Sequence, residues 1–391
     1  MRGISIKKID WLMVAVTVSL IVLGLLMITN ATGRPGAVEP GESFWQIFSR
    51  ADKTAVKYVM MVALLGLAAT VAAVWIDYRW IGELHHFIYW ANVGLLLLLF
   101  VFGRTVNGNL NWISIAGIGF QPAEIAKVAV VVSLAKRLSL YEKPIDTYRE
   151  LGKELLYVAI PLVLILVQKD LGTSMVYIFF VVVMLFAAKT KMKLLGTLGG
   201  IGLISIVPTW LFFLTNNQKA RVIALINPES LDPDQIRQLV NGKTAVGAGR
   251  IWGMGFFNPG SYSQLNYIPE QRTDFIFAVL AETLGLVGCT VLLVLYAVLV
   301  FRMLRAARLA ADKFGSYLVI GLMAMLLFHV FENIGMVIGI MPMTGIPLPF
   351  LSYGGTALVA NMIAVGLALN VGARRNRESI FAKHKTLEIG T

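Results

Sequence analysis

The chain has 391 residues, of which 57% are hydrophobic and only 14% are charged, and its mean hydropathy is +0.74. Soluble domains carry roughly 25% charged residues, so this composition excludes a soluble globular protein and indicates an integral membrane protein. The net charge of +12 does not predict a nucleic-acid partner, because the lysines and arginines cluster in short loops between apolar runs. The single cysteine, Cys289, excludes a disulfide framework and a cysteine-based metal site.

Ten apolar runs approach the length of about 20 residues that a helix needs to cross a bilayer. They cover residues 11–29, 55–75, 87–103, 121–138, 155–168, 171–188, 194–214, 274–301, 316–340 and 354–372. The first exceeds the roughly 7–15 apolar residues of a signal peptide, so we expect it to be retained. The sequence therefore predicts an all-α integral membrane protein with about ten transmembrane helices, in a single polytopic domain covering residues 1–391.

Lysine and arginine gather in alternate connections. They precede the first span and follow the fourth, sixth, eighth and tenth, whereas the other short connections hold isolated charges such as Arg104 and Lys169. Because basic loops stay in the cytoplasm, this pattern places both termini there.

One long polar segment, residues 215–273, lies between spans seven and eight. It is too rich in Asn, Gly, Pro and charge to span, and it is too long for a simple connection. Residues 235–245 place Ile236, Leu239 and Val240 on one side, which predicts a helix lying on the outer interface. We therefore expect a large structured extracytoplasmic loop, and loops of this kind usually carry function.

Asp274 lies where this loop meets the eighth apolar run. At the first turn of a membrane helix, it would have free backbone N–H groups and a low-dielectric surrounding beside it. The residue is then either an ordinary helix cap or a working carboxylate. The loop offers further charged candidates: Arg221, Lys243, Arg250, Glu270 and Arg272.

Two other motifs map to the same outward half of the membrane. Residues 107–127 read NGNLNWISIAGIGFQPAEIAK, in which Glu124 and Lys127 share a helix face and can pair below the surface. Such a pair is either functional or a structural ion pair, and Trp112 by itself is typical of an interfacial belt. The turn QKDLGTS, residues 168–174, is either a plain hairpin or part of the same site.

The segment GIMPMTGIPLPFLSYGGTALVAN, residues 339–361, cannot form a continuous helix because of its prolines and glycines. Irregular backbone at that depth is tolerated only against protein or a water-filled cavity. His329, Glu332 and Asn333 precede it, and interhelical hydrogen bonding is the simpler interpretation of these three. Together the motifs predict an outward-facing polar cavity, suited to a substrate with an anionic head and an apolar tail.

NWISIAGIGFQPAEIAK, QKDLGTS, TDFIFAVLAE and MPMTGIPLPFLSYGGTA resemble motifs of the SEDS family (shape, elongation, division and sporulation), in order over nearly the whole chain. QLNYIPEQRTDFIFAV and GIPLPFLSYGG look more like its elongation branch than its division branch. The resemblance implies a peptidoglycan glycosyltransferase that polymerises lipid II into β-1,4 glycan strands outside the bacterial cytoplasmic membrane. It also implies two kinds of partner, a class B penicillin-binding protein (the transpeptidase) and other elongation-complex membrane proteins.

The resemblance assigns the family's essential acidic residue to Asp274, and its early Trp, Glu and Lys to Trp112, Glu124 and Lys127. The sequence also departs from the family pattern. Asn111 stands where arginine is frequent, Lys169 where proline is common, Arg272 where histidine is usual and Thr283 where a second glutamate often follows.

An inverting displacement would convert the α-linked donor into a β-linked strand without a covalent intermediate. In this hypothesis Asp274 is the base, and Glu124 and Lys127 position it. The candidate substrate-binding residues are Trp112, Gln121, Arg221, Lys243, Arg272 and Ser352, with the cations directed at pyrophosphate. A Mg²⁺ or Mn²⁺ ion bridging Asp274 and phosphate is a further expectation.

Two other function classes stay open. A lipid II flippase would also use broken helices and buried charges, although no cytoplasm-side polar cavity mirrors the outward one. A non-catalytic scaffold for the transpeptidase would need the buried charges only for structure.

Overall fold

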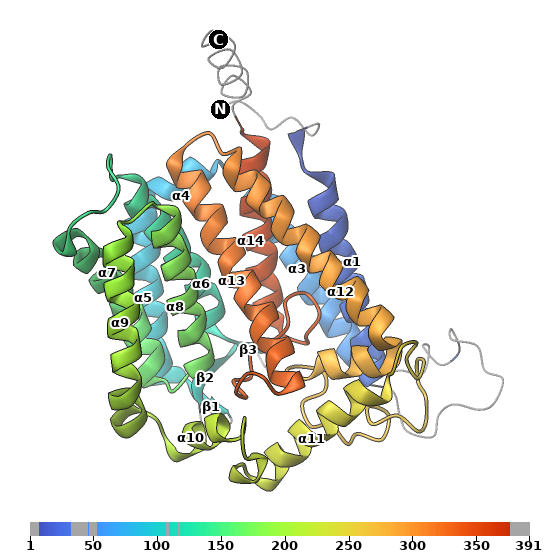
Figure 1. The fold of residues 1–391 in the computed structure, drawn as a ribbon. Helices are drawn as coiled ribbons and strands as arrows, with labels where there is room; N and C mark the ends of the chain where they lie inside the picture. Colours follow the sequence, from blue (N-terminus) through green and yellow to red (C-terminus); the bar gives the residue numbers. More distant parts are fainter. Residues whose placement is uncertain (1–7, 33–45, 47–52, 107–108, 116–117, 376–391) are drawn as a thin grey trace, which may run out of the picture.

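The computed structural model describes residues 8–32, 46, 53–106, 109–115 and 118–375. The described chain is mainly helical, and α1 begins and α14 ends at the same end of the bundle (Figure 1). The helices that form the bundle are α1 (Trp11–Ala31), α3 (Lys53–Trp75), α4 (Tyr78–Glu83), α5 (His85–Phe102), α6 (Pro122–Ser139), α7 (Tyr148–Val167), α8 (Leu171–Ala187), α9 (Met192–Pro208), α12 (Ile276–Arg308), α13 (Lys313–Ile338) and α14 (Gly355–Ala373).

A helix occupies each of the ten ranges predicted to span the membrane. In the described part of the chain, seven helices are long and apolar enough to cross a bilayer, and α8 is apolar but shorter. α7 begins earlier than predicted because Thr147 and Glu150 form a capping box that adds a polar first turn. The class of integral membrane protein is confirmed, whereas the exact number of spans stays a prediction.

A small antiparallel sheet between α5 and α6 corrects the all-α prediction. It has the order β1 (Arg104–Val106), β2 (Asn109–Ile115) and β3 (Ile118–Phe120). Trp112 pairs with Arg104 on one side of β2, and Ile113 pairs with Phe120 on the other. Aromatic and β-branched residues suit a pleated strand, which explains why this stretch is not helical. The following helix begins at Pro122, where a missing N–H has no cost.

The loop between α9 and α12 is structured, as predicted from its length and composition. After a π-helical turn at Thr209–Phe213, it forms α10 (Asn216–Ile223), a 3₁₀ turn (Pro228–Ser230) and α11 (Pro233–Ala248). α11 packs against α12 and α13. The remaining residues up to α12 run as consecutive turns.

The backbone of α12 is interrupted at Gly285, whose φ of 64° and ψ of −160° are not helical. The preceding loop closes this interruption: Met254 N–H donates to the Glu282 carbonyl (2.8 Å) and Leu286 N–H donates to the Arg250 carbonyl (2.9 Å). Gly253, with φ of 83°, lies so close that an added Cβ would be 2.2 Å from the Thr283 carbonyl oxygen. Only glycine permits both the backbone conformation and the approach.

The C-terminal end of α1 holds the same loop from the other side. Asn30 donates to the Thr283 hydroxyl (2.8 Å) and accepts from the Phe257 N–H (2.7 Å). Gln271 donates to the Ala31 carbonyl (2.9 Å). The loop that leads to Asp274 is therefore fixed to two helices that are far apart in the sequence.

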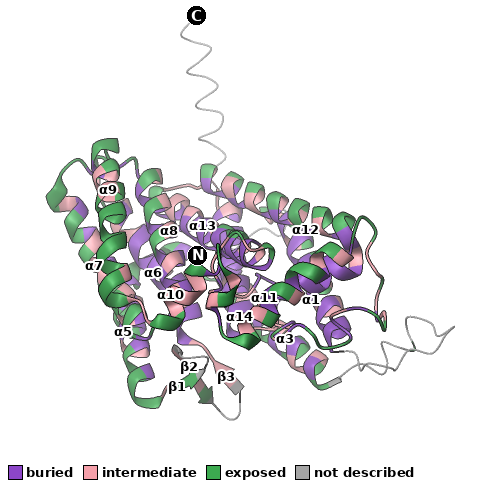
Figure 2. Ribbon diagram, turned by 60° about the horizontal axis from the view of Figure 1, so that its bottom comes forward, coloured by how far each residue is buried: buried purple, intermediate pink, exposed green. Residues whose placement is uncertain are grey.

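The centre of the bundle is formed by α13, which packs against α6, α8, α12 and α14. Figure 2 shows buried residues concentrated there, whereas α9 lies at the edge and is largely exposed. Leu194 is the one buried residue of α9. An apolar helix that is exposed on most sides is typical of a surface that lipid covers.

Candidate active site

A cavity of about 650 Å³ opens between the small sheet, α10, α11 and the irregular segment before α14. Six of the candidates named from the sequence line it: Trp112, Gln121, Glu124, Arg221, Glu270 and Asp274. They come from β2, the start of α6, α10 and the turns that lead into α12. The fold therefore brings together motifs that are separated by more than a hundred residues in the chain.

Asp274 is held by contacts to its backbone and its carboxyl group. Asn333 Nδ2 donates to the carbonyl of Asp274 (2.8 Å) and to that of Ile346 (2.7 Å). Gly345, with φ of 76°, lies against the carboxyl group, since an added Cβ would be 3.2 Å from Asp274 Oδ2. The N-cap of α12 is Phe275, and no side chain caps this end. Helix capping therefore does not explain the presence of Asp274.

Burial raises the pKa of Asp274 to about 7, and the nearby Glu270 carboxylate adds to the shift while Arg221 opposes it. Burial lowers the pKa of the Arg221 guanidinium, against the attraction of Asp274 and Asp232. A carboxyl group that titrates near neutral pH is matched to proton transfer. The electrostatics of the cavity thus fit a general base.

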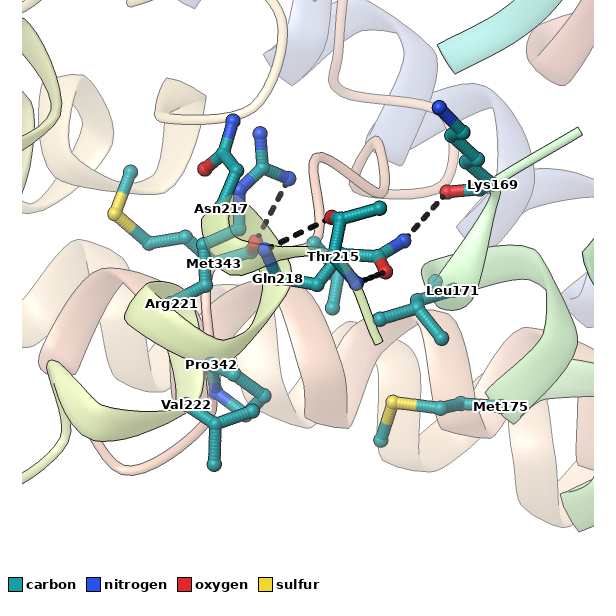
Figure 3. Close-up of a pocket in the computed structure, with 12 residues that line it drawn as sticks. Lys169, Leu171, Met175, Thr215, Asn217, Gln218, Arg221, Val222, Pro342 and Met343 are labelled. Carbon is teal, nitrogen blue, oxygen red and sulfur yellow. Dashed lines mark hydrogen bonds between the residues drawn. The ribbon is translucent and has the colours of Figure 1, made fainter. Parts of the chain in front are cut away.

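Arg221 lines both the cavity and a second pocket of about 270 Å³, whose lining residues are drawn in Figure 3. Its Nη1 donates to the Met343 carbonyl (3.1 Å), while its buried Nε has no partner among the described residues. The second pocket is lined largely by apolar side chains, among them Leu171, Met175 and Val222. The polar cavity and the apolar pocket therefore adjoin, and they share Asn217, Arg221, Met343 and Thr344 as lining residues.

Lys127 lies beneath the cavity and does not line it. Its Nζ is 2.8 Å from Glu124 Oε1 and 2.7 Å from His329 Nε2, and its side chain is 1% exposed. A hydrogen bond donated by Nζ to Nε2 requires the ring proton to be on Nδ1, and Nδ1 has no partner among the described residues. Glu124 is thus held at the cavity wall by a buried cation.

Three other predicted residues lie outside the cavity lining. Ser352 Oγ donates to the Thr273 carbonyl (2.6 Å), and Tyr353 N–H donates to the Arg272 carbonyl (2.8 Å), so this segment supports the turn before Asp274. The Lys243 ammonium lies beside Gly339, the C-cap of α13, where an added Cβ would be 2.1 Å from Nζ. Helix C-terminal carbonyls attract a cation there.

The cavity also contains residues that the sequence did not single out. The first turns of α11 contribute Asp234, Arg237 and Gln238, together with Asp232 before it. The predicted amphipathic helix was a partial signal: Leu239 is buried as expected, whereas Val240 is 46% exposed.

A second buried carboxylate lies behind the cavity. The Thr344 hydroxyl, which lines the cavity, donates to Glu332 Oε1, and Glu332 Oε2 has no partner in the described structure. The expectation that His329, Glu332 and Asn333 make hydrogen bonds between elements agrees with these contacts.

No group of three or more His, Cys, Asp or Glu side chains among the described residues could hold a metal ion. Mg²⁺ commonly binds through one or two carboxylates together with substrate phosphates. Asp274 lines the cavity and offers one such carboxylate, and a metal ion there stays a prediction.

The family model described as "Cell cycle protein", FTSW_RODA_SPOVE, matches residues 10–377. The chain belongs to this family. It is 34% identical over 368 residues to the peptidoglycan glycosyltransferase MrdB of Escherichia coli, which covers 94% of both chains. It is also 34% identical over 371 residues to the stage V sporulation protein E of Bacillus subtilis, which covers 93% of this chain and 96% of the relative.

Solved structures of relatives have the same fold. A chain of a peptidoglycan synthase complex, described as coordinating polymerization and crosslinking, superposes with a TM-score of 0.76 at 28% identity, covering 94% of this chain and 99% of that one. The rod shape determining protein RodA of Thermus thermophilus gives a TM-score of 0.69 at 25% identity, covering 94% and 98%. The predicted SEDS family, and its RodA-like branch, are confirmed.

Proposed function

We propose that this protein polymerises lipid II on the outer face of the bacterial cytoplasmic membrane, with Asp274 as the general base. The observation that carries the proposal is the place of Asp274, whose carboxyl group lies at the wall of a 650 Å³ polar cavity. Burial there raises the pKa of this group. The cavity suits an anionic head group, and the adjoining pocket suits an apolar tail.

The activity follows from the relatives. MrdB of Escherichia coli is a peptidoglycan glycosyltransferase, and FtsW of Geobacter metallireducens is a probable one; both align over more than nine tenths of each chain. The chain is therefore a peptidoglycan glycosyltransferase. Its likeness to a rod shape determining protein supports a role in cell elongation.

The reaction is one inverting displacement. The acceptor hydroxyl oxygen attacks the anomeric carbon of the donor while Asp274 accepts the hydroxyl proton. A new C–O bond forms, the bond from the anomeric carbon to the pyrophosphate oxygen breaks, and its electron pair leaves with undecaprenyl pyrophosphate. Proton transfer to a positioned base contributes about 10²–10⁴-fold to the rate of such a step.

Arg221 is the cation best placed for the departing pyrophosphate, because it lies between the polar cavity and the apolar pocket. Guanidinium donors stabilise the charge that develops on phosphate oxygens as the bond breaks. Lys243 and Arg272 lie outside the cavity lining, so their predicted contacts with phosphate would require the loop to move. Trp112 and Gln121 line the wall on which the sugars would lie.

We also propose that Mg²⁺ or Mn²⁺ binds together with the substrate. Asp274 would hold such an ion together with phosphate oxygens of the substrate, and the ion when bound would offset the charge of the pyrophosphate. The Glu124–Lys127 pair keeps the adjacent wall in place.

We further propose ten membrane spans, with both termini in the cytoplasm and residues 215–273 outside. The helices at all ten predicted ranges support this arrangement, as do the basic residues at the start of α1 and the ends of α12 and α14. A class B penicillin-binding protein is the proposed partner, supported by the similarity to a chain of a peptidoglycan synthase complex. Other elongation-complex membrane proteins remain proposed partners.

Purified full-length protein in detergent, supplied with lipid II, separates this function from the two alternatives. We expect glycan strands to form, and their amount to increase when the transpeptidase is added. Transbilayer movement of lipid II in liposomes without polymer would instead identify a flippase. Neither polymer nor movement, with or without the transpeptidase, would identify a scaffold.

A further inference from the structure

A small polar cavity lies at the opposite end of the bundle from Asp274. It has a volume of about 110 Å³ and is enclosed by the start of α1 and the ends of α12 and α14. Its charged lining residues are Lys8, Asp10, Arg302, Arg305 and Arg375. Four cations and one carboxylate therefore surround a space that the proposed reaction does not use.

The carboxylate neutralises only one of these cations. Asp10 accepts from Arg302 Nε (2.8 Å) and Nη2 (2.6 Å) and also caps α1 through the Met13 N–H (3.2 Å). Lys8, Arg305 and Arg375 form no ion pair with any described residue. The partially negative C-terminal ends of α12 and α14 offset part of their charge, at about half an elementary charge each. The cavity stays positively charged.

The residue before Arg375 in the chain differs from it. Arg374 is fully engaged away from the cavity, with Asp77 (3.3 Å), the Asn370 side chain (2.8 Å) and the Trp75 carbonyl (3.0 Å). Arg375, by contrast, lines the cavity and has no anionic partner there. One cavity is therefore lined by three basic residues that have no ion-pair partner in the described structure: Lys8, Arg305 and Arg375.

We propose that this cavity binds the phosphate head group of an anionic phospholipid, in the membrane leaflet opposite the active site. A volume of about 110 Å³ admits a phosphate group. Arginine side chains hold phosphate oxygens through paired N–H donors, and Lys8 adds a point charge. Basic pockets between transmembrane helices bind lipid head groups in this way.

The surface next to the cavity indicates a lipid rather than a soluble anion. Large apolar side chains next to Asp10 and Arg302 in the sequence are exposed. Trp11 is 58% exposed, Leu12 is 49% exposed and Phe301 is 62% exposed. Acyl chains would cover this surface while the phosphate occupies the cavity. Tryptophan is also the side chain that prefers the membrane–water interface.

Lipid-dependent thermal stability of the full-length protein tests the proposal. Phosphatidylglycerol and phosphatidylcholine with the same acyl chains are titrated into protein in zwitterionic detergent, and Tm is followed. We expect phosphatidylglycerol to raise Tm and phosphatidylcholine to leave it nearly unchanged. Arg305→Gln should weaken the apparent affinity for phosphatidylglycerol about fivefold, the equivalent of about 1 kcal/mol for one cation near anionic lipid.

Arg308→Gln is the matched control, because it removes the same charge from the last turn of α12 but does not line the cavity. We expect this variant to keep the affinity of the wild type. If it weakened binding as much as Arg305→Gln, general surface charge would explain the effect and the site would be refuted. Should Arg305→Gln fail to fold, Lys8→Gln serves as the second variant.

Two further additives distinguish the sources of the anion. Inorganic phosphate at matched ionic strength should not reproduce the increase in Tm; if it did so in full, the lipid assignment would be wrong. An acidic peptide, polyglutamate, should not displace phosphatidylglycerol. Displacement by the peptide, with loss of the lipid effect, would assign the cavity to a protein partner and overturn the proposal. These measurements do not depend on the polymerase assay.

Discussion

Asp274 has a pKa of about 7, raised by burial and by Glu270 and lowered by Arg221. A base acts only in its ionised form, so kcat/KM for lipid II polymerisation should rise about tenfold per pH unit below 7 and level off above it. The rate rises with pH, and not the reverse, because Asp274 must be deprotonated to accept the proton of the acceptor hydroxyl. Initial rates across pH 5.5 to 9 provide the measurement, and a profile that is flat through neutral pH would rule out this role.

The two charged neighbours should move this profile in opposite directions. Arg221→Gln removes a cation that favours the ionised form of Asp274, so the midpoint of the pH profile should shift to higher pH. The plateau rate should also fall, because the departing pyrophosphate loses a stabilising cation. Glu270→Gln removes a repelling charge, so the midpoint should shift to lower pH.

Lys127 is buried with Glu124 and His329, and removing one partner leaves a charge unpaired. Lys127→Met should therefore lower the free energy of unfolding by about 3–5 kcal/mol, because Glu124 remains buried. The double variant Glu124→Gln/Lys127→Met should be more stable than Lys127→Met alone. Thermal unfolding in detergent checks the order, and a double variant no more stable than the single one would contradict the account.

At the scale of elements, the interruption of α12 depends on two glycines. Gly285→Ala should lower stability by about 1–3 kcal/mol, because Gly285 has a positive φ and an added Cβ would be 2.4 Å from the Gly253 nitrogen. Gly196→Ala on α9 is the control, since an added Cβ there has no atom within 4 Å. Alanine favours the helix, so this control should be as stable as the wild type or slightly more stable. Equal effects of the two substitutions would refute the packing argument.

The helices were predictable from the sequence, and the interruption was not. A long apolar run determines a membrane helix by itself, so all ten predicted ranges carry a helix. Gly285 lies in such a run, where glycine is common, and its conformation depends on residues 250–255 packing beside it. The sheet around Trp112 was likewise missed because short strands depend on their neighbours.

The same distinction applies to the site. Asp274 and Glu124 could be predicted as parts of one site, because ionisable residues at membrane depth are costly without a role. Arg221 was one of several charged residues of the loop, and the sequence alone did not single it out from them. The positions of Lys243 and Ser352 could not be predicted, since they depend on how α11 and the segment before α14 pack on α13. The charge of Lys243 did not indicate that its ammonium group lies at the C-terminal end of α13.

For the whole molecule, the orientation in the membrane is the main prediction. In a Cys289→Ser background, Glu229→Cys in the long loop should react with a membrane-impermeant maleimide in intact spheroplasts. Lys143→Cys, in the connection after α6, should react only after permeabilisation. Both positions are exposed, so access alone decides the result. Labelling of Lys143→Cys in intact spheroplasts would show that the predicted orientation is wrong.

The most direct test of the central claim compares two carboxylates of the same cavity. Purified wild type, Asp274→Asn and Glu270→Gln are matched for folding by Tm and supplied with lipid II at pH 8, and the initial rate of glycan strand formation is measured. We expect Asp274→Asn to be slower than the wild type by about 10²-fold or more, and Glu270→Gln to stay within a few-fold. An Asp274→Asn protein that polymerises at a rate near that of the wild type would remove Asp274 from the chemistry and contradict the account.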